Sequence, residues 1–245
     1  MNKYLESIGK NSCKAFTSKV NNREKNKVLK KFLYLIEKNK SKIIKQNKKD
    51  IYFAKRKGLR KNLIDRLELN DKKINEIIKS IKNIIKLKDP TNITLSKWKR
   101  PNGLTIKRVT IPIGVIGVIY ESRPNVTSDI SSLCFKSGNC VILRGGSEAY
   151  FSNKIISNLF RKALKDRKVD QNYVQFIESK NRKLVNLMLS NMKKYIDVII
   201  PRGGKNLVKK VQNISSVPII GHLEGVCHTY IDKDANLNFA KKIVH

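Results

Sequence analysis

The spacing of apolar residues predicts a helical N-terminal region. Over Ser12–Asn39, apolar side chains recur near helical spacing among lysines, which is typical of an amphipathic helix. The same pattern predicts helices over Lys40–Lys57, Lys61–Leu67 and Asp71–Leu87, and isoleucines form the buried stripe of the last one. We therefore expect residues 1–88 to form a helical region that packs on the following part of the chain.

A small β-hairpin is predicted next. Asp89-Pro90 ends the helical pattern, because proline cannot continue a helix. Residues 93–110 then alternate weakly around Pro101-Asn102-Gly103, and an Asn-Gly pair readily adopts the positive φ angles of a hairpin turn. We expect residues 89–110 to form a separate hairpin, which is a candidate oligomerisation element.

From residue 111 onward, short apolar runs are each followed by a polar or glycine-bearing turn and then by a helical pattern. This alternation is typical of βαβ units, whose strands form a parallel sheet with helices on both faces. Residues 111–245 are therefore predicted to form an α/β domain. The expected strands are Val115–Tyr120, Cys140–Leu143, Asp197–Ile200 and Val217–Ile220, and the expected helices cover residues 127–136, residues 150–165 and a segment that ends near residue 212.

Two Arg-Gly-Gly turns follow predicted strands, at Arg144-Gly145-Gly146 and Arg202-Gly203-Gly204. Ligands of open parallel sheets bind beyond the carboxyl ends of the strands, where helix N-termini attract anions. Glycine lets the backbone approach a ligand closely, and arginine donates to phosphate or ribose oxygens. A nucleotide site is one interpretation and a pair of tight turns is the other, since neither turn matches G-x-G-x-x-G or a P-loop.

Asn125 lies between a predicted strand and a predicted helix. Its side chain could cap the helix, or its amide could donate to a developing oxyanion in a cleft, and the residues alone leave both alternatives open. No metal is expected, because the histidines share no metal-ligand spacing: His222, His228 and His245. The cysteines are widely spaced and are expected to be reduced, with interior packing favoured over catalysis: Cys13, Cys134, Cys140 and Cys227.

The net charge of +34 is the strongest feature of the composition. Such a charge attracts nucleic acid, but it would equally favour a phosphorylated substrate or a dinucleotide. The excess runs through the whole chain, with 30 Lys and Arg against 9 Asp and Glu in the first 100 residues, and aromatic residues make up only 7%. We favour drift toward AT-rich codons at solvent-facing positions, so a nucleic-acid partner is not expected.

The chain is expected to be globular and cytoplasmic. Its longest apolar run, residues 111–120, is about half the roughly 20 residues that a membrane-spanning helix needs. The N-terminus mixes charge throughout and has no apolar core followed by small residues, so no secretory signal is expected. No membrane association is predicted.

Long ordered motifs cover nearly the whole chain. They are NREKNKVL (residues 22–29), LIDRLELN (63–70), RVTIPIGVIGVIYESRPNVTSDISSLCFKSGNCVILRGGSE (108–148), YIDVIIPRGGKNLV (195–208) and VPIIGHLEGVCHTYID (217–232). Together they closely resemble the γ-glutamyl phosphate reductases, a branch of the aldehyde dehydrogenase superfamily. The resemblance implies an aldehyde-dehydrogenase-like fold with a Rossmann-like cofactor-binding domain.

The resemblance also implies a reaction, the NADPH-dependent reduction of L-glutamate 5-phosphate to glutamate 5-semialdehyde and phosphate in proline biosynthesis. In the family a cysteine thiolate attacks the acyl phosphate, and hydride transfer then reduces the thioacyl intermediate. Asn125 matches the asparagine whose amide stabilises the oxyanion, and His222 lies near the position of a general-base glutamate in hydrolytic relatives. The residues expected around NADP are Arg144, Gly145, Gly146, Ser147 and Glu148 at the adenosine ribose, and Gly203 and Gly204 at the pyrophosphate.

Some family features are not matched in this sequence. None of the four cysteines matches the catalytic one, which the family carries shortly beyond the stretch resembling AKKIV, followed by the catalytic domain. The chain as printed is therefore expected to lack the catalytic domain and to bind cofactor at best. The resemblance further implies a homo-oligomer in the full-length form and an association with glutamate 5-kinase. The alternatives are an inactive cofactor-binding fragment, a basic nucleic-acid-binding protein on the same fold, and another acyl-phosphate or aldehyde dehydrogenase of the superfamily.

Overall fold

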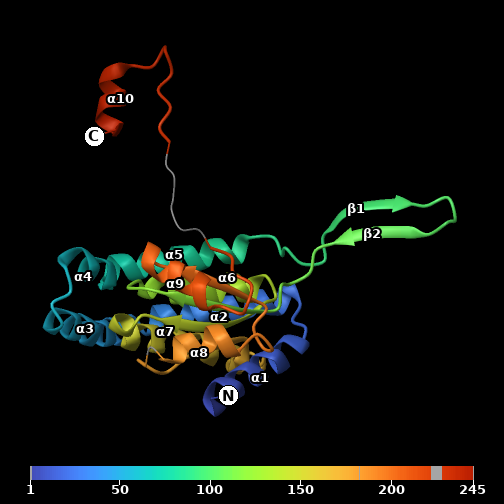
Figure 1. Cartoon of the computed structure of the whole chain (residues 1–245), viewed down its shortest axis with the longest axis horizontal. Helices are drawn as coiled ribbons and strands as arrows, with labels where there is room; N and C mark the ends of the chain where they lie inside the picture. Colours follow the sequence, from blue (N-terminus) through green and yellow to red (C-terminus); the bar gives the residue numbers. More distant parts are fainter. Residues whose placement is uncertain (1, 182, 222–227, 245) are drawn as a thin grey trace.

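The computed structural model describes residues 2–181, 183–221 and 228–244 (Figure 1). At the centre of this part of the chain lies a four-stranded parallel sheet in the order β5-β4-β3-β6. The predicted α/β fold with a parallel sheet is therefore confirmed. The strands are β3 (Val115–Tyr120), β4 (Cys140–Gly145), β5 (Val174–Phe176) and β6 (Val198–Arg202).

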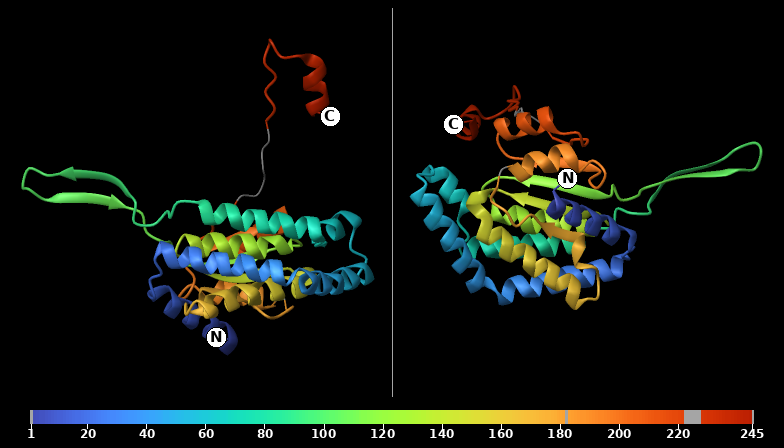
Figure 2. Two further views of the ribbon diagram at one scale, coloured as in Figure 1. Left: turned by 180° about the vertical axis from the view of Figure 1, so that it is seen from behind. Right: turned by 60° about the horizontal axis from the view of Figure 1, so that its bottom comes forward.

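Helices cover both faces of the sheet (Figure 2). On one face, the Tyr120 hydroxyl of β3 lies 2.7 Å from the Thr127 hydroxyl of α6. On the other face, the Gln175 amide of β5 donates to the backbone oxygen of Ile8 on α1 at 2.6 Å. The first face carries α6 (Pro124–Lys136) and α7 (Tyr150–Asp166), and the second carries α1 (Lys3–Thr17), α8 (Lys183–Asn191) and α9 (Lys205–Ile214).

The remaining N-terminal helices form an outer layer over α6 and α7 (Figure 2). The isoleucine stripe predicted from the sequence is buried, from Ile74 to Ile84. The Phe32 ring lies 4.6 Å from the Phe160 ring of α7, measured between centroids, so the outer helices and the sheet share one hydrophobic core. These helices are α2 (Asn22–Lys38), α3 (Lys40–Arg56), α4 (Lys61–Leu67) and α5 (Asp71–Lys86).

One predicted helix is wrong, because residues 12–39 do not form a single helix. α1 ends at Thr17 and α2 begins at Asn22. The Ser18 hydroxyl donates to the backbone oxygen of Ala15 at 2.6 Å, and the Asn21 side chain accepts the Glu24 backbone N–H at 2.9 Å. These side chains compete locally with the helical backbone, which is why the break occurs here.

The predicted hairpin is confirmed as β1 (Thr94–Lys99) paired antiparallel with β2 (Thr105–Val109). Gly103 adopts a φ of 87° in the turn, which only glycine takes readily. The hairpin extends away from the rest of the molecule in both figures, and every residue of β1 is exposed.

The segment Val217–Ile220 is not a strand, and this prediction is wrong. It forms one isolated bridge between Ile219 and Ile199, and Pro218 has no N–H to donate to a ladder. Sequence patterning did not identify β5, α8, α10 (Leu237–Val244) or the short 3-10 turns η1 (Ser147–Ala149) and η2 (Gln171–Tyr173).

Membrane-spanning helices were sought in the described ranges, and none of the helices there has the length and apolar content to cross a bilayer.

Candidate functional site

The turns after β3, β4 and β6 meet at the carboxyl edge of the sheet. Tyr120, the last residue of β3, pairs with Gly145 on one side and with Arg202 on the other, so the three strands end level with one another. The structure therefore places every predicted site residue of these turns along one edge: Asn125, Arg144, Gly145, Gly146, Ser147, Glu148, Gly203 and Gly204.

Glu148 links the turn after β4 to the turn after β3. Its Oε1 atom accepts hydrogen bonds from the backbone N–H and the hydroxyl of Ser122, both at 2.8 Å. Ser122 has a φ of 38°, a left-handed conformation that these two bonds hold in place. A Cβ atom on Gly146 would lie 2.0 Å from Glu148 Oε1, so a larger residue there would displace the Glu148 carboxylate from its present position.

Arg144 is buried at the end of β4, with 5% of its surface exposed. Its guanidinium donates to the backbone oxygen of Gly145. Burial raises the pKa of the neighbouring Tyr120 phenol, while the Thr127 hydroxyl and the charge of Arg144 act in the opposite direction. The guanidinium therefore contributes positive charge to the edge of the sheet from beneath the backbone rather than from the surface.

The N-terminus of α9 already holds an anion. The Glu121 carboxylate accepts the backbone N–H of Gly204, the N-cap residue of α9, at 3.0 Å. A Cβ atom on Gly203 would lie 2.5 Å from the same carboxylate oxygen. Free N–H groups at a helix start attract phosphate as well as carboxylate, so a phosphate bound here would replace Glu121.

Asn125 is the second residue of α6 and does not cap it, since the N-cap position belongs to Arg123 and Pro124 occupies the first turn. The Asn125 amide nitrogen donates to Asp129 Oδ2 at 3.4 Å, and Asp129 Oδ1 accepts the Ser80 hydroxyl at 2.7 Å. An amide nitrogen carries two hydrogens, so Asn125 retains a donor for a ligand.

A pocket of about 450 Å³ lies beside Asn125, between α6 and the helices α4 and α5. Its lining combines both signs of charge with a few apolar side chains. The lining residues are Asp65, Arg66, Glu68, Leu69, Lys73, Glu76, Ile77, Ser80, Arg123, Asn125 and Asp129. Apart from Asn125, sequence patterning did not identify this set, because its members come from α4, α5, α6 and the segments beside them.

The cysteines that the structure describes are poorly suited to nucleophilic chemistry. Cys134 and Cys140 are buried, and burial raises the pKa of both thiols, that of Cys134 to about 12. Cys13 is half-buried, and burial raises its pKa as well. His222, His245 and Cys227 lie outside the described residues. Within the described ranges, no three His, Cys, Asp or Glu side chains gather as a metal site.

Comparison with known proteins identifies the class. A sequence model of the aldehyde dehydrogenase family matches residues 4–245, and the chain therefore belongs to the aldehyde dehydrogenase family.

Within that family, the most informative similarities are to γ-glutamyl phosphate reductases. The chain is 44% identical over 246 residues to the γ-glutamyl phosphate reductase of Clostridium tetani, a match that covers 100% of this chain and 57% of the relative. The crystal structure of the Thermotoga maritima γ-glutamyl phosphate reductase matches with a TM-score of 0.91 at 40% identity, over 98% of this chain and 58% of that chain.

The Saccharomyces cerevisiae γ-glutamyl phosphate reductase matches with a TM-score of 0.82 at 33% identity, over 97% of this chain and 61% of that chain. The resemblance stated from the sequence motifs is thus confirmed. The chain spans little more than half the length of these relatives.

Proposed function

We propose that this chain forms the NADPH-binding part of an enzyme that reduces L-glutamate 5-phosphate to glutamate 5-semialdehyde and phosphate in proline biosynthesis. One observation carries the proposal: the glycine turns after β4 and β6 meet at one edge of the sheet, where a backbone N–H of the α9 N-terminus already donates to a carboxylate. The 44% identity to a γ-glutamyl phosphate reductase over the whole chain supports the choice of a nicotinamide dinucleotide as the proposed ligand of this edge.

The turns fit a dinucleotide in two respects. The Gly204 backbone N–H at the α9 N-terminus donates to the Glu121 carboxylate, and a pyrophosphate that displaced this carboxylate would accept the same N–H. Arg144 brings a positive charge to the end of β4, next to Gly145, Gly146, Ser147 and Glu148, and this turn would hold the adenosine ribose. When bound, NADPH would supply the hydride for the reduction.

Asn125 is proposed as the oxyanion donor. Its amide lies in the wall of the pocket, with one hydrogen directed to Asp129 and a second available to the acyl oxygen of the substrate. The nucleophile that the resemblance implies is not matched by any cysteine of this chain. Catalysis is therefore proposed to require the part of the relatives that this chain does not cover.

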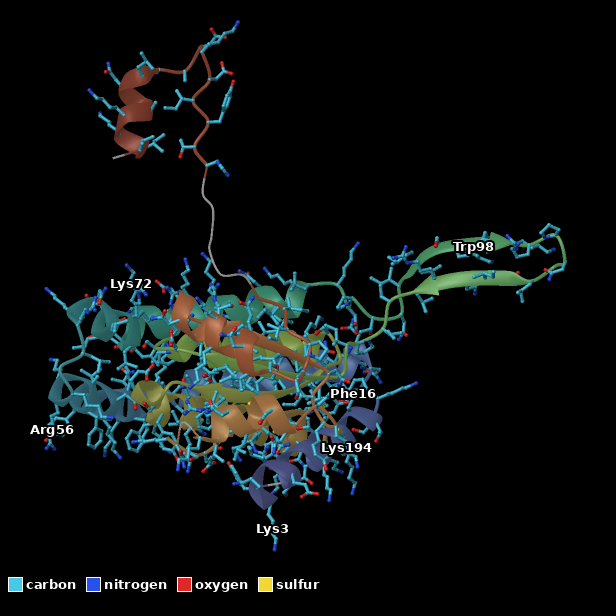
Figure 3. All side chains as sticks on the ribbon, viewed as in Figure 1. Lys3, Phe16, Arg56, Lys72, Trp98 and Lys194 are labelled. Carbon is cyan, nitrogen blue, oxygen red and sulfur yellow. The ribbon has the colours of Figure 1, made fainter. Side chains whose placement is uncertain are left out.

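The proposal extends to partners and location. L-glutamate 5-phosphate is the proposed substrate, the hairpin is a proposed contact between copies of the chain, and glutamate 5-kinase is a proposed partner. The cytoplasm is the proposed location. The labelled Lys3, Arg56 and Lys72 lie on different sides of the molecule in Figure 3, so these basic residues do not form a single patch.

A chimera tests the activity directly. Residues 1–245 would be joined to the part of the Clostridium tetani reductase beyond the matched region, and NADPH formation would be followed from NADP, phosphate and glutamate 5-semialdehyde. We expect phosphate-dependent NADPH formation that is slowed in Asn125→Ala while the KM for NADP is unchanged. A folded chimera that oxidises other aldehydes without phosphate, and not this one, would contradict the proposal.

A further inference from the structure

The pocket beside Asn125 differs in charge from the rest of the chain. Four of the 19 acidic residues are among its eleven lining residues, whereas a proportional share would be about one: Asp65, Glu68, Glu76 and Asp129. Arg66, Lys73 and Arg123 line the same pocket. A concave site with both signs of charge is complementary to a ligand that itself carries both signs, and its volume falls within the range of small-molecule sites.

In the part of the chain that the structure describes, none of the four carboxylates of this pocket forms an ion pair. Among the described residues, every ion pair within 4.0 Å involves acids elsewhere, at Glu6, Glu24, Glu37, Asp89, Asp166 or Glu178. The pocket therefore keeps its negative groups available to a ligand.

Asp129 is the most enclosed of these acids, and it is half-buried. Its two oxygens accept hydrogen bonds from the neutral Ser80 hydroxyl and the neutral Asn125 amide. Burial raises its pKa, against the opposing effect of these two bonds. A partly buried carboxylate without a counter-charge is costly, and a ligand cation beside it would offset that cost.

Asp129 also stands at a suitable distance from the proposed reacting centre. It follows Asn125 by four residues on α6, so the two side chains lie on the same face of the helix, with the Asn125 amide nitrogen 3.4 Å from Asp129 Oδ2. An extended glutamyl chain that lies across both side chains can place its acyl oxygen against the Asn125 amide and its α-amino group against the Asp129 carboxylate. A ligand whose acyl oxygen contacts Asn125 can therefore reach Asp129 with its amino group.

We propose that this pocket binds the α-amino acid end of the substrate, with Asp129 receiving the α-ammonium group and Arg66 and Lys73 the α-carboxylate. The inference rests on the proposed function, since it takes Asn125 as the contact of the acyl group. Arg66 of α4 and Lys73 of α5 would then contact the substrate directly. The negative charge of Asp129 on α6 would make the enzyme prefer an α-amino acid over a simple dicarboxylic acid.

The test uses the 245-residue chain with L-glutamate as the probe and glutarate, which lacks the amino group, as its comparator. Binding is followed by amide chemical shifts of α5 and the first two turns of α6. We expect saturable shifts there and affinity for L-glutamate roughly tenfold or more above that for glutarate. Equal affinity for the two compounds, or no shifts at these helices, would overturn the proposal.

Asp129→Asn should reduce the L-glutamate affinity roughly tenfold or more and leave glutarate binding nearly unchanged. Asp166→Asn is the matched control, because it removes the same charge from the far end of α7. A folded Asp129→Asn chain that binds L-glutamate as tightly as the original would also overturn the proposal. The glutarate comparison needs no variant, so it decides the question even when Asp129→Asn fails to fold.

NADPH titration of the same samples separates this inference from the proposed function. If the chain binds NADPH but binds L-glutamate no more tightly than glutarate, only the proposed substrate pocket is contradicted. If the folded original chain does not bind NADPH, the proposed cofactor site is contradicted, whatever the result with L-glutamate.

Discussion

The central sheet and the β1–β2 hairpin are both β-structure, but their surroundings are opposite. All six residues of β3 are buried, and all six residues of β1 are exposed. β3 is flanked by two strands and covered by helices, whereas the hairpin is an isolated two-stranded ribbon, which is marginally stable in water. The sheet is therefore stabilised by the chain's own core, and the hairpin depends on its ladder and on any partner that covers it.

The apolar side chains of the hairpin sharpen this contrast. Leu95, Trp98 and Leu104 are 57%, 45% and 57% exposed, and Figure 3 shows Trp98 far from the rest of the molecule. Apolar residues grouped on an exposed element are typical of a surface that another protein covers. The role of the hairpin in oligomerisation stays a prediction, and the following experiments separate the two regions.

The largest effect is expected in the core. Phe135, on α6, is 1% exposed and packs edge-on against the Phe160 and Tyr173 rings. Phe135→Ala should lower the free energy of unfolding by about 3–5 kcal/mol, because it removes buried apolar surface and leaves a cavity. Urea unfolding followed by circular dichroism measures the loss. A loss below about 1 kcal/mol would mean that this core is not packed as described.

A smaller loss is expected from the contact between α3 and α7. The Asp50 carboxylate is buried and accepts the backbone N–H groups of Phe151 and Ser152 at 3.0 and 2.8 Å, which satisfies the start of α7. Asp50→Ala should cost roughly 1–3 kcal/mol, since these N–H groups would lose their acceptor. The same urea titration measures it, with Asp234→Ala on the exposed C-terminal segment as the control.

The root of the hairpin should respond to pH. Burial acts to raise the pKa of Asp89, but hydrogen bonds from Lys25 and Thr91 outweigh it and hold the pKa below its ordinary value. The pKa is thus lower in the folded than in the unfolded chain, so ionised Asp89 stabilises the fold above about pH 4. That contribution is lost as the pH falls through the folded-state pKa.

Unfolding titrations of the original chain and Asp89→Asn measure this effect. The difference in unfolding free energy between them should be largest near neutral pH and should shrink on acidification. A difference that grows as the pH falls would have the wrong sign for the ion pair between Lys25 and Asp89.

The smallest change in stability is expected in the hairpin, at Trp98 of β1. Trp98→Ala should alter the unfolding free energy of the monomer by no more than about 0.5 kcal/mol, because the side chain is 45% exposed and is not part of the hydrophobic core. It should nevertheless weaken self-association, which sedimentation velocity over a range of protein concentrations would detect. An unchanged association constant would contradict the proposal that the hairpin forms the contact between copies of the chain.

Local patterns predicted the parts of the fold whose partners are close in sequence. The uninterrupted apolar run Val115–Tyr120 marks β3 with its observed bounds, and the helical spacing of Lys61–Leu67 marks α4. β5 was not predicted, because the polar Gln175 is the middle one of its three residues. The Gln175 side chain can be buried because its amide donates to the Ile8 backbone oxygen and the Ser12 hydroxyl of α1, which lie 167 and 163 residues away in the sequence.

The candidate site, like the fold, was predicted only where the signal is local in the sequence. Glycine turns after strands pointed to the residues at Arg144 and Gly203, and the strand register then brought them to one edge. Glu121 was not identified, because its role depends on the N–H of Gly204, 83 residues later. The same holds for Asp129, whose partner Ser80 lies 49 residues earlier. Such contacts follow from packing and leave no periodic signal in the sequence.

The central claim is that the carboxyl edge of the sheet binds NADPH, and calorimetric titration of the 245-residue chain with NADPH and NADH tests it most directly. The account predicts saturable binding of one NADPH, weaker binding of NADH, and a loss of NADPH affinity in an Arg144→Ala chain that retains its fold. Unchanged NADPH affinity in that folded variant, or no discrimination between the two dinucleotides, would contradict it.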